Sequence, residues 1–346
     1  MAAGRQYTVS YLATGGHYPA SHGTFAKKYK KGGLVVPKNG SVRHWGATSA
    51  FPTVSVGKGA NFLVDVVFTP SKTTSTTAPS TGATPTPVPS PPSAAGSGTV
   101  QTGFPNAAST GVRPGVALRD SGSITVNTPG TVIQGLSVSG TITVNASNVV
   151  IRDTLIRGGG NGYPIRITSG VKNTLIEYVE IDNLNSTGIG IFYNGGCGRV
   201  RYADIHSAED GIRVGADDVV VEYSYIHDLY RQPGGHHDTL QIRSGDNVTL
   251  RGNTFLPYVA RTGDPMNAAI QVGSLTGAPL RNFRVIDNYM DGGNYTVNGG
   301  DSSNVASGEF SGNVFGPHSR YGARMGISSS VVWSNNLWAA NGATVG

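Results

Sequence analysis

The chain has 346 residues, of which 50 are glycine and 13% are charged, a composition typical of a turn-rich all-β protein and unlike that of a helical one. Its single cysteine, Cys197, excludes an intrachain disulfide and a cysteine-based metal site, and no apolar run approaches the roughly 18 residues of a membrane span. The formal net charge of +6 comes from residues 1–70, but no nucleic-acid motif accompanies it, so we expect neither a nucleic-acid partner nor membrane insertion.

Residues 1–70 form the first predicted part, a basic β-rich module. Strand-like runs occur at 7–11, 33–37 and 62–70, but so short a segment supplies few partners for a complete sandwich. The runs at 2–11, 15–19, 51–54 and 61–70 resemble the second half of a β-sandwich domain of unassigned function in actinobacterial surface proteins and some of their phages. The resemblance implies a partial sandwich with a truncated start, so the missing secretory signal after Met1 is weak evidence about location.

Residues 71–100 form the second part, which is rich in Thr, Ser and Pro. Such a segment buries little apolar surface, and we expect a disordered, extended spacer with polyproline character. A spacer that provides reach is typical of proteins outside the cytoplasm, so we expect an extracellular location or a virion surface.

Residues 101–346 form the third part, in which a short β-branched pattern recurs. The pattern alternates with period two, as strands do, and its spacing drifts between 18 and 35 residues. Because no single repeat can bury its own apolar face, the repeats must stack as a solenoid, and we predict a parallel β-helix. The nine predicted core positions are Ile133, Ile151, Ile176, Val200, Val221, Leu250, Val285, Phe310 and Val332.

The third part also carries a family resemblance. The run GlyPheProAsnAlaAlaSerThrGlyVal at 103–112, the run LeuArgAsp at 118–120 and the end SerAsnAsnLeuTrp at 334–338 resemble pectate-lyase-like right-handed β-helix proteins of actinobacteria and actinophage, of the minor tail or tail-spike type. The resemblance implies right-handed coils. It leaves the activity open, because this fold hosts lyases, hydrolases and proteins that only bind.

Stacking the repeats predicts two rows of polar side chains. Asn253, Asn288, Asn313 and Asn335 follow four late core strands, and we interpret them as a structural ladder. A second strand in each coil predicts an outward row that either binds the hydroxyls and carboxylates of a sugar polymer or only keeps the sheet soluble. Its members are Arg166, Gly190, Arg213, Gln241 and Gln271.

The middle coils concentrate histidine, aspartate and arginine. General acid–base chemistry on a polysaccharide needs such residues, and paired carboxylates are typical of glycosidases. The alternatives are a face that contacts sugar without cleaving it, a set of structural ladders, and a metal site, which no ligand spacing supports. The candidate catalytic residues are His237, Asp238, Asp210, His227 and Arg213. The further candidate sugar contacts are Arg243, His206 and His236, with Tyr230 and Tyr258 in two longer loops.

Asp217 and Asp218 are a weak signal for calcium, because the same residues are ordinary turn formers, and we expect no other cofactor. The favoured function is recognition of a bacterial surface polysaccharide, with or without its depolymerisation, by a phage tail or tail-spike type of appendage. A secreted polysaccharide lyase or glycoside hydrolase and a purely structural fibre or capsid decoration are the alternatives. A last coil without an obvious cap would favour a homotrimer.

Overall fold

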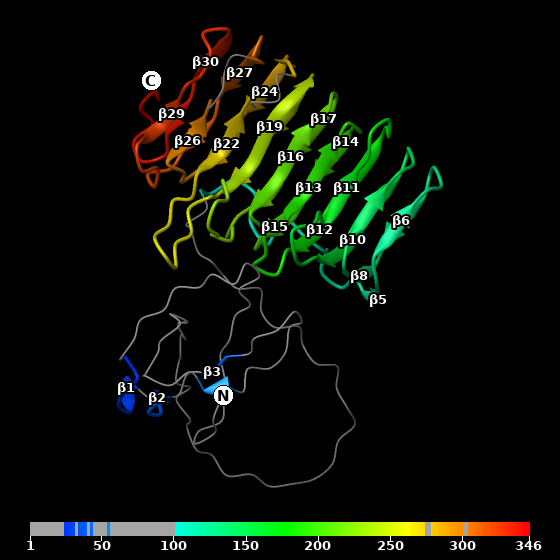
Figure 1. The fold of residues 1–346 in the computed structure, drawn as a ribbon. Coiled ribbons are helices and arrows are strands. Elements are labelled where there is room, and N and C mark those ends of the chain that lie inside the picture. The colour runs from blue at the N-terminus through cyan, green and yellow to red at the C-terminus, as the bar shows by residue number, and fades with distance from the viewer. Residues whose placement is uncertain are drawn as a thin grey trace. The chain divides into compact units, whose positions relative to one another are not determined.

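The computed structural model describes residues 24–31, 34–39, 42–43, 54–55, 101–273, 278–299 and 304–346 (Figure 1). The chain divides into two units, Met1–Pro89 and Ser90–Gly346. In the first unit, β1 (Tyr29–Lys31) pairs antiparallel with β2 (Leu34–Val36), and β3 (Val42–Arg43) pairs antiparallel with β4 (Val54–Ser55). The predicted spacer lies outside the described residues, so the three-part division stays a prediction.

The second unit is a β-helix whose coils each contribute strands to parallel sheets (Figure 1). The first sheet contains β7 (Val132–Gln134), the first half of β10 (Val150–Arg157) and of β12 (Thr174–Asp182), β14 (Gly198–Arg201), β17 (Val219–Glu222), β20 (Thr249–Arg251), β24 (Phe283–Ile286), β27 (Gly308–Ser311) and β30 (Val331–Ser334).

The second sheet continues from the first around one corner, because β10 and β12 run through the corner and belong to both. It contains β5 (Arg119–Ser121), β8 (Leu136–Ser139), the second half of β10 and of β12, β15 (Asp204–His206), β18 (Tyr225–Ile226), β21 (Thr254–Phe255), β25 (Tyr289–Met290), β28 (Val314–Phe315) and β31 (Leu337–Trp338).

The third sheet is separate and faces the viewer in Figure 1. It contains β6 (Ile124–Val126), β9 (Ile142–Val144), β11 (Ile165–Ile167), β13 (Ile189–Asn194), β16 (Asp210–Gly215), β19 (Asp238–Asp246), β22 (Ala268–Val272), β26 (Tyr295–Asn298) and β29 (Gly322–Met325), and β23 (Leu280–Arg281) pairs with the end of β19. Long loops project where β19 and β22 begin.

The observed register of the first sheet confirms eight of the nine predicted core positions. Each pairs with its neighbour in the order of the coils, from Ile133 with Ile151 to Val285 with Phe310. The ninth prediction is wrong by one residue: Trp333 pairs with Phe310, and Val332 is 57% exposed. The indole of Trp333 is partly buried and packs on the rings of Phe310 and Phe315, so an aromatic side chain stands where the pattern predicts a β-branched one.

A single residue in the left-handed conformation bends each coil from the first sheet into the second. The φ angles at this corner lie between 44° and 67°, at Gly135, Asp153, Tyr178, Tyr202, Tyr223, Gly252, Asp287, Gly312 and Asn335. The predicted asparagine ladder follows this corner, but its fourth member is Asn336 and not Asn335. The side chains of Asn253, Asn288, Asn313 and Asn336 are buried and hydrogen-bond to one another from coil to coil.

The C-terminal residues fold back over the last coil as a cap. Val345 is 2% exposed and belongs to the apolar core, its amide donates to the carbonyl of Asn336, and its carbonyl accepts from Trp333 Nε1. The expectation of an uncapped last coil is therefore wrong, and this argument for a homotrimer falls with it.

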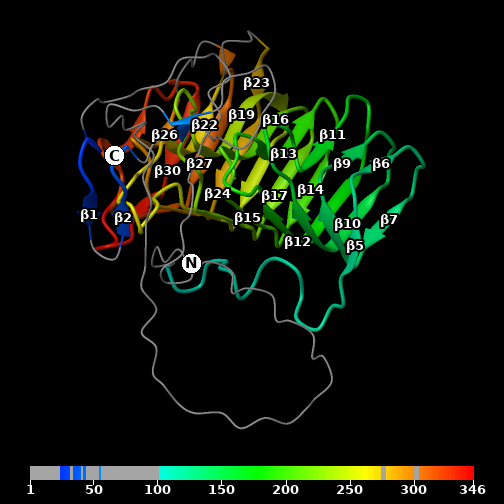
Figure 2. The same cartoon turned by 60° about the horizontal axis from the view of Figure 1, so that its bottom comes forward.

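A segment at 101–113, which we call the strap, runs along the outside of the second sheet before the first coil begins (Figure 2). Phe104 packs on the Tyr289 ring, the carbonyl of Pro105 accepts from Thr254, and Arg113 forms a two-pronged pair with Asp153. The strap thus crosses the coils from late to early and contains the whole 103–112 run. Among the described residues, no helix is long and apolar enough to span a membrane.

Candidate functional site

The edge of the third sheet where its strands begin carries the strongest concentration of chemistry-bearing side chains. Asp210 opens β16, and Asp238 opens β19 one coil later. The loop at 229–237 leads into β19, and the loop at 257–267 leads into β22 (Figure 1). Arg231 in the first loop pairs with Asp264 in the second, with two bonds of 2.7 and 2.8 Å, so the loops hold each other.

Asp210 and Asp238 form a buried carboxyl pair, and both are 0% exposed. Asp210 accepts from the amide of Asp238 at 2.9 Å and from Arg213 at 2.9 Å. Asp238 accepts from Gln241 Nε2 at 2.8 Å and from Asn267 Nδ2 at 2.6 Å. Every carboxylate oxygen of the pair therefore already has a protein donor, and none faces solvent.

One carboxyl group of the pair, that of Asp238, has a raised pKa. Burial, and then the negative charge of Asp210, raise the pKa of Asp238 to about 8, and the hydrogen bonds from Gln241 and Asn267 offset this only in part. Asp238 is therefore mainly protonated at neutral pH. Glu209 is next to the pair, and burial followed by the charge of Asp210 raises its pKa as well.

Two arginines lie over the carboxyl pair. Arg213 bridges Asp210 and Gln241 Oε1, the latter at 2.9 Å, and its side chain is 18% exposed. Burial and the neighbouring Arg213 lower the pKa of Arg243. Gln241, predicted to contact sugar, is 2% exposed and serves instead as a link between Arg213 and Asp238.

The outward row of the third sheet differs from its prediction at one coil. Arg166 pairs with Phe192, Phe192 with Arg213, Arg213 with Gln241, and Gln241 with Gln271. The position predicted for Gly190 thus belongs to Phe192. Gly190 lies two residues earlier, where a Cβ would meet the Gly211 carbonyl at 2.6 Å.

Phe192 belongs to a group of side chains that we call the aromatic–arginine cluster. It consists of Tyr163, Arg166, Phe192 and Arg213, all of them partly exposed. The rings of Tyr163 and Phe192 lie 4.9 Å apart, Arg166 lies 5.7 Å from the Tyr163 ring centre, and Arg213 lies 6.0 Å from the Phe192 ring centre. Tyr163 and Phe192 are not among the predicted site residues, and the turn glycines do not reveal them: Asn194, not Gly195, pairs with Gly215 one coil later.

The histidines of the loop at 229–237 have different environments. His237 is 0% exposed, and its Nε2 accepts from the amide of Gln232 at 2.9 Å. Burial and then the charge of Arg231 lower its pKa, so the ring is neutral and anchors the loop. His236 is exposed, and Tyr230 is partly buried.

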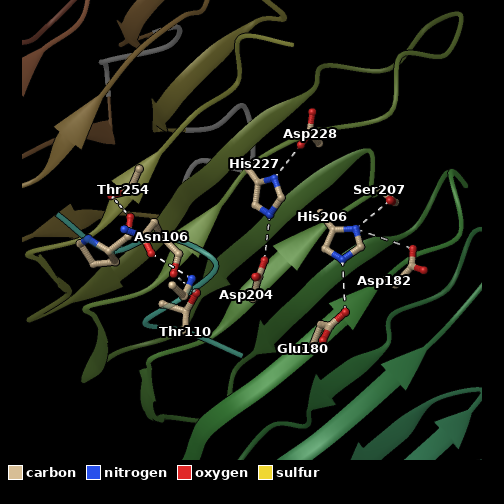
Figure 3. Close-up of polar contacts among 12 residues, drawn as sticks. Asn106, Thr110, Glu180, Asp182, Asp204, His206, Ser207, His227, Asp228 and Thr254 are labelled. Carbon is tan, nitrogen blue, oxygen red and sulfur yellow. Dashed lines mark hydrogen bonds and ion pairs between the residues drawn. The ribbon is translucent and has the colours of Figure 1, made fainter. Parts of the chain in front are cut away.

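His206 ends β15 and His227 directly follows β18, so both lie on the second sheet (Figure 3), whereas Asp210 and Asp238 open strands of the third sheet. The imidazole of His227 bridges Asp204 and Asp228, each at 2.8 Å, and stacks on Tyr225 at 4.0 Å. Burial alone would lower its pKa, but the two carboxylates outweigh burial and raise it to about 9.

The ring of His206 lies one coil earlier, 3.8 Å from carboxylate oxygens of Glu180 and of Asp182. Figure 3 shows both histidines among acids, with the strap residues Asn106 and Thr110 beside them. The predicted cluster is therefore divided between two sheets. The consecutive strands β15 and β16 belong to different sheets, because the chain turns between them.

The remaining predicted residues have structural partners. Tyr258 stacks on His318 at 4.1 Å, and His318 pairs with the buried Asp291. Asp217 accepts from the amide of Asp246, and Asp218 accepts from Asn247 Nδ2, so both join turns of successive coils. Among the described residues, no three or more His, Cys, Asp or Glu residues form a group that could hold a metal ion, and calcium stays an untested expectation.

Comparison with known proteins supports the fold. Residues 112–282 match the family model described as a right handed beta helix region, which confirms the predicted right-handed β-helix. Residues 1–64 match a domain of unknown function, DUF4082, in agreement with the predicted resemblance of this segment to a domain of unassigned function.

No curated protein matches the chain. Among solved structures, the chain is similar to the tailspike protein gp49 from Acinetobacter baumannii bacteriophage Fri1, a capsular polysaccharide depolymerase. The identity is 10%, the match covers 62% of this chain and 52% of that protein, and the TM-score is 0.27. The chain thus spans about half the length of that tailspike.

Proposed function

We propose that the β-helix binds an acidic polysaccharide of a bacterial surface along the outward face of its third sheet. The observation that carries the proposal is the aromatic–arginine cluster, in which two guanidinium groups lie beside two partly exposed rings on adjacent coils. Guanidinium groups bind carboxylates with two parallel hydrogen bonds, and aromatic rings offer an apolar surface to the C–H face of a sugar.

The backbone under the cluster supports this assignment. β11, β13 and β16 are paired on both sides in the interior of the third sheet, and the side chains below them are buried aliphatic core. A cluster on such a scaffold is held in place before a ligand arrives, so little conformational entropy is lost on binding.

Display outside the cell is the second part of the proposal. The Thr-, Ser- and Pro-rich composition of residues 71–100 supports a spacer that extends the β-helix from whatever the N-terminal module grips. A phage tail or tail-spike type of appendage and a secreted protein both fit this arrangement.

Cleavage is a second candidate, favoured by one observation: the buried Asp238, whose pKa is raised, lies beside a second carboxyl group, Asp210. Pairs of this kind divide the roles of acid and base in glycosidases. Because all four oxygens already bond to protein donors, cleavage also requires a displacement of Gln241 or Asn267, and recognition alone is the simpler function.

The test uses the full chain and immobilised bacterial polysaccharides, namely uronate-bearing capsules and teichoic acid, with dextran as the neutral member. Loss of a charged hydrogen bond in Arg166→Gln should weaken retention on an acidic polymer about tenfold or more. Arg119→Gln is the matched control, because Arg119 is exposed on the second sheet.

The proposal fails if no acidic polymer retains the protein, or if the two variants bind alike. Release of new reducing or unsaturated ends, abolished by Asp210→Asn, would establish cleavage, and retention without release would establish recognition alone.

A further inference from the structure

Tyr321 is the most exposed large hydrophobic side chain among the described residues, at 63%. It lies directly before β29, at the far end of the third sheet from β6. Its ring centre is 5.6 Å from that of Tyr295, and the guanidinium carbon of Arg320 lies 5.9 Å from it. The far end of the sheet therefore repeats the combination of two rings and a guanidinium group found in the aromatic–arginine cluster.

The exposed ring is carried on a fixed backbone. The amide of Arg320 donates to the carbonyl of Gly293 at 2.9 Å, and the amide of Tyr321 donates to the carbonyl of Asn294 at 2.8 Å. These bonds extend the parallel pairing of β26 and β29 beyond the ends of the strands. An aromatic side chain held in this way loses little entropy when a ligand stacks on it.

The two aromatic groups lie on one sheet but not on one row of side chains. The outward row ends at Met325 on β29, whereas Tyr295 and Tyr321 lie at the edge of the sheet where β26 and β29 begin. From β16 the third sheet continues through β19, β22 and β26 to β29, which is about 19 Å at the usual strand spacing of about 4.8 Å. The outward row between them offers the partly exposed amide side chains of Gln271 and Asn298, whereas Gln241 is buried. Amides and partly exposed rings on one face of a sheet suit a polymer of hydroxylated rings more than a compact ligand.

We infer that Tyr295, Arg320 and Tyr321 form a second subsite for the polysaccharide of the proposed function, on which this inference rests. The polymer then crosses the third sheet obliquely, from the aromatic–arginine cluster to the edge where β26 and β29 begin, and engages both aromatic groups at once. Binding at one group raises the effective concentration of the same chain at the other, so an oligosaccharide long enough to reach both binds far more tightly than a short one.

The test compares a disaccharide and an octasaccharide, both prepared from the acidic polymer that the wild-type full chain retains. Wild type should prefer the octasaccharide about a hundredfold or more. Tyr321→Ala should reduce this preference at least tenfold and leave the disaccharide affinity nearly unchanged, whereas Tyr321→Phe should behave as wild type. Tyr223→Ala is the control, because Tyr223 is 38% exposed at the corner between the first and second sheets.

The possible outcomes separate the two proposals. If Tyr321→Ala keeps the full preference for the octasaccharide, or weakens both ligands equally, the second subsite is overturned and the aromatic–arginine cluster remains the binding site. If wild type retains no acidic polymer, both proposals fall. Circular dichroism of each variant excludes loss of the fold as the cause of a reduced affinity.

Discussion

The backbone amide of Asp238 donates a 2.9 Å hydrogen bond to Oδ1 of Asp210 one coil earlier, which joins the two carboxyl groups in one buried site. Two ionised carboxylates in such a site would repel each other with little solvent screening. The native state therefore keeps a proton on Asp238, whose pKa is about 8, and the unfolded chain releases that proton near the ordinary value of 3.8.

The first prediction concerns the pH dependence of stability. Between about pH 4 and pH 8 the native state holds a proton on Asp238 that the unfolded state lacks. The contribution of this group to the free energy of unfolding is therefore fully present below pH 4 and is lost as the pH rises through about 8. Asp238→Asn removes the titrating group, so its free energy of unfolding should fall less between pH 5 and pH 9 than that of wild type. Urea denaturation at both pH values measures this. Asp120→Asn, at an exposed residue, should keep the wild-type slope, and an unchanged slope in Asp238→Asn would contradict the raised pKa.

The second prediction concerns His227, which bridges Asp204 and Asp228. Its pKa is raised from 6.5 to about 9, so its contribution to the free energy of unfolding is fully present below pH 6.5 and is lost as the pH rises through about 9. His227→Gln should lower stability at pH 6 by on the order of 1–3 kcal/mol and by less at pH 9.5. NMR titration of the imidazole checks the pKa directly, and His236→Gln, at an exposed ring, should change neither measurement.

The third prediction concerns the asparagine ladder. Asn288 donates to Asn313 Oδ1 and to the carbonyl of Leu250, and it accepts from both nitrogens of Asn253. Asn288→Ala leaves several of these buried groups without partners and should cost about 2–4 kcal/mol. Asn335→Gly is the control, because this exposed residue has a φ of 53° that glycine adopts freely, and it should change stability by less than about 1 kcal/mol. Equal losses in the free energy of unfolding for Asn288→Ala and Asn335→Gly, measured by chemical denaturation, would refute the structural role of the ladder.

The fourth prediction concerns the C-terminal cap. Val345→Asp buries a charge in the apolar core, so it should displace the cap, expose the aromatic end of the core and lower stability by about 2–5 kcal/mol. The exposed last coil should then associate with other copies. Sedimentation velocity should show larger species for Val345→Asp and not for Val332→Asp, whose position on the last coil is exposed. A monomeric Val345→Asp variant with wild-type stability would argue against capping.

The fold follows from the sequence wherever one local rule repeats. Successive coils must put the same side of each strand into the core, so β-branched residues mark the register from Ile133 to Phe310 without any knowledge of the loops. The rule fails at Trp333, because its ring packs on the buried rings of Phe310 and Phe315 and the β-branched Val332 beside it turns outward. It also fails at Gly190, because two isoleucines, Ile189 and Ile191, flank this glycine and either could match Ile165; in the structure Ile191 pairs with Ile165, and Phe192 takes the outward position.

The candidate site follows from the sequence only in part. The residues Asp210, Asp238 and Arg213 were predicted together, and they do meet, because each lies at or near the start of a strand in the same sheet. The residues that donate hydrogen bonds to these carboxyl groups from elsewhere in the chain, such as Asn267, are not marked by any local sequence pattern. The cap at Val345 and the strap on the second sheet likewise depend on segments that return to the coils from outside the repeat.

The repeated pattern by itself determined that this chain forms a parallel β-helix and which side chains build most of its core, because such a pattern permits only a stacked solution, and the family resemblance added the right hand. Only the tertiary structure decided the separation of His206 and His227 from Asp210 and Asp238. The residues are close in the chain, but the turn between β15 and β16 directs them to different sheets. The tertiary structure also decided that the carboxyl pair is buried and that the pKa of Asp238 is raised, because burial and the charge of a neighbour on the adjacent coil depend on distances in space that spacing along the chain does not encode.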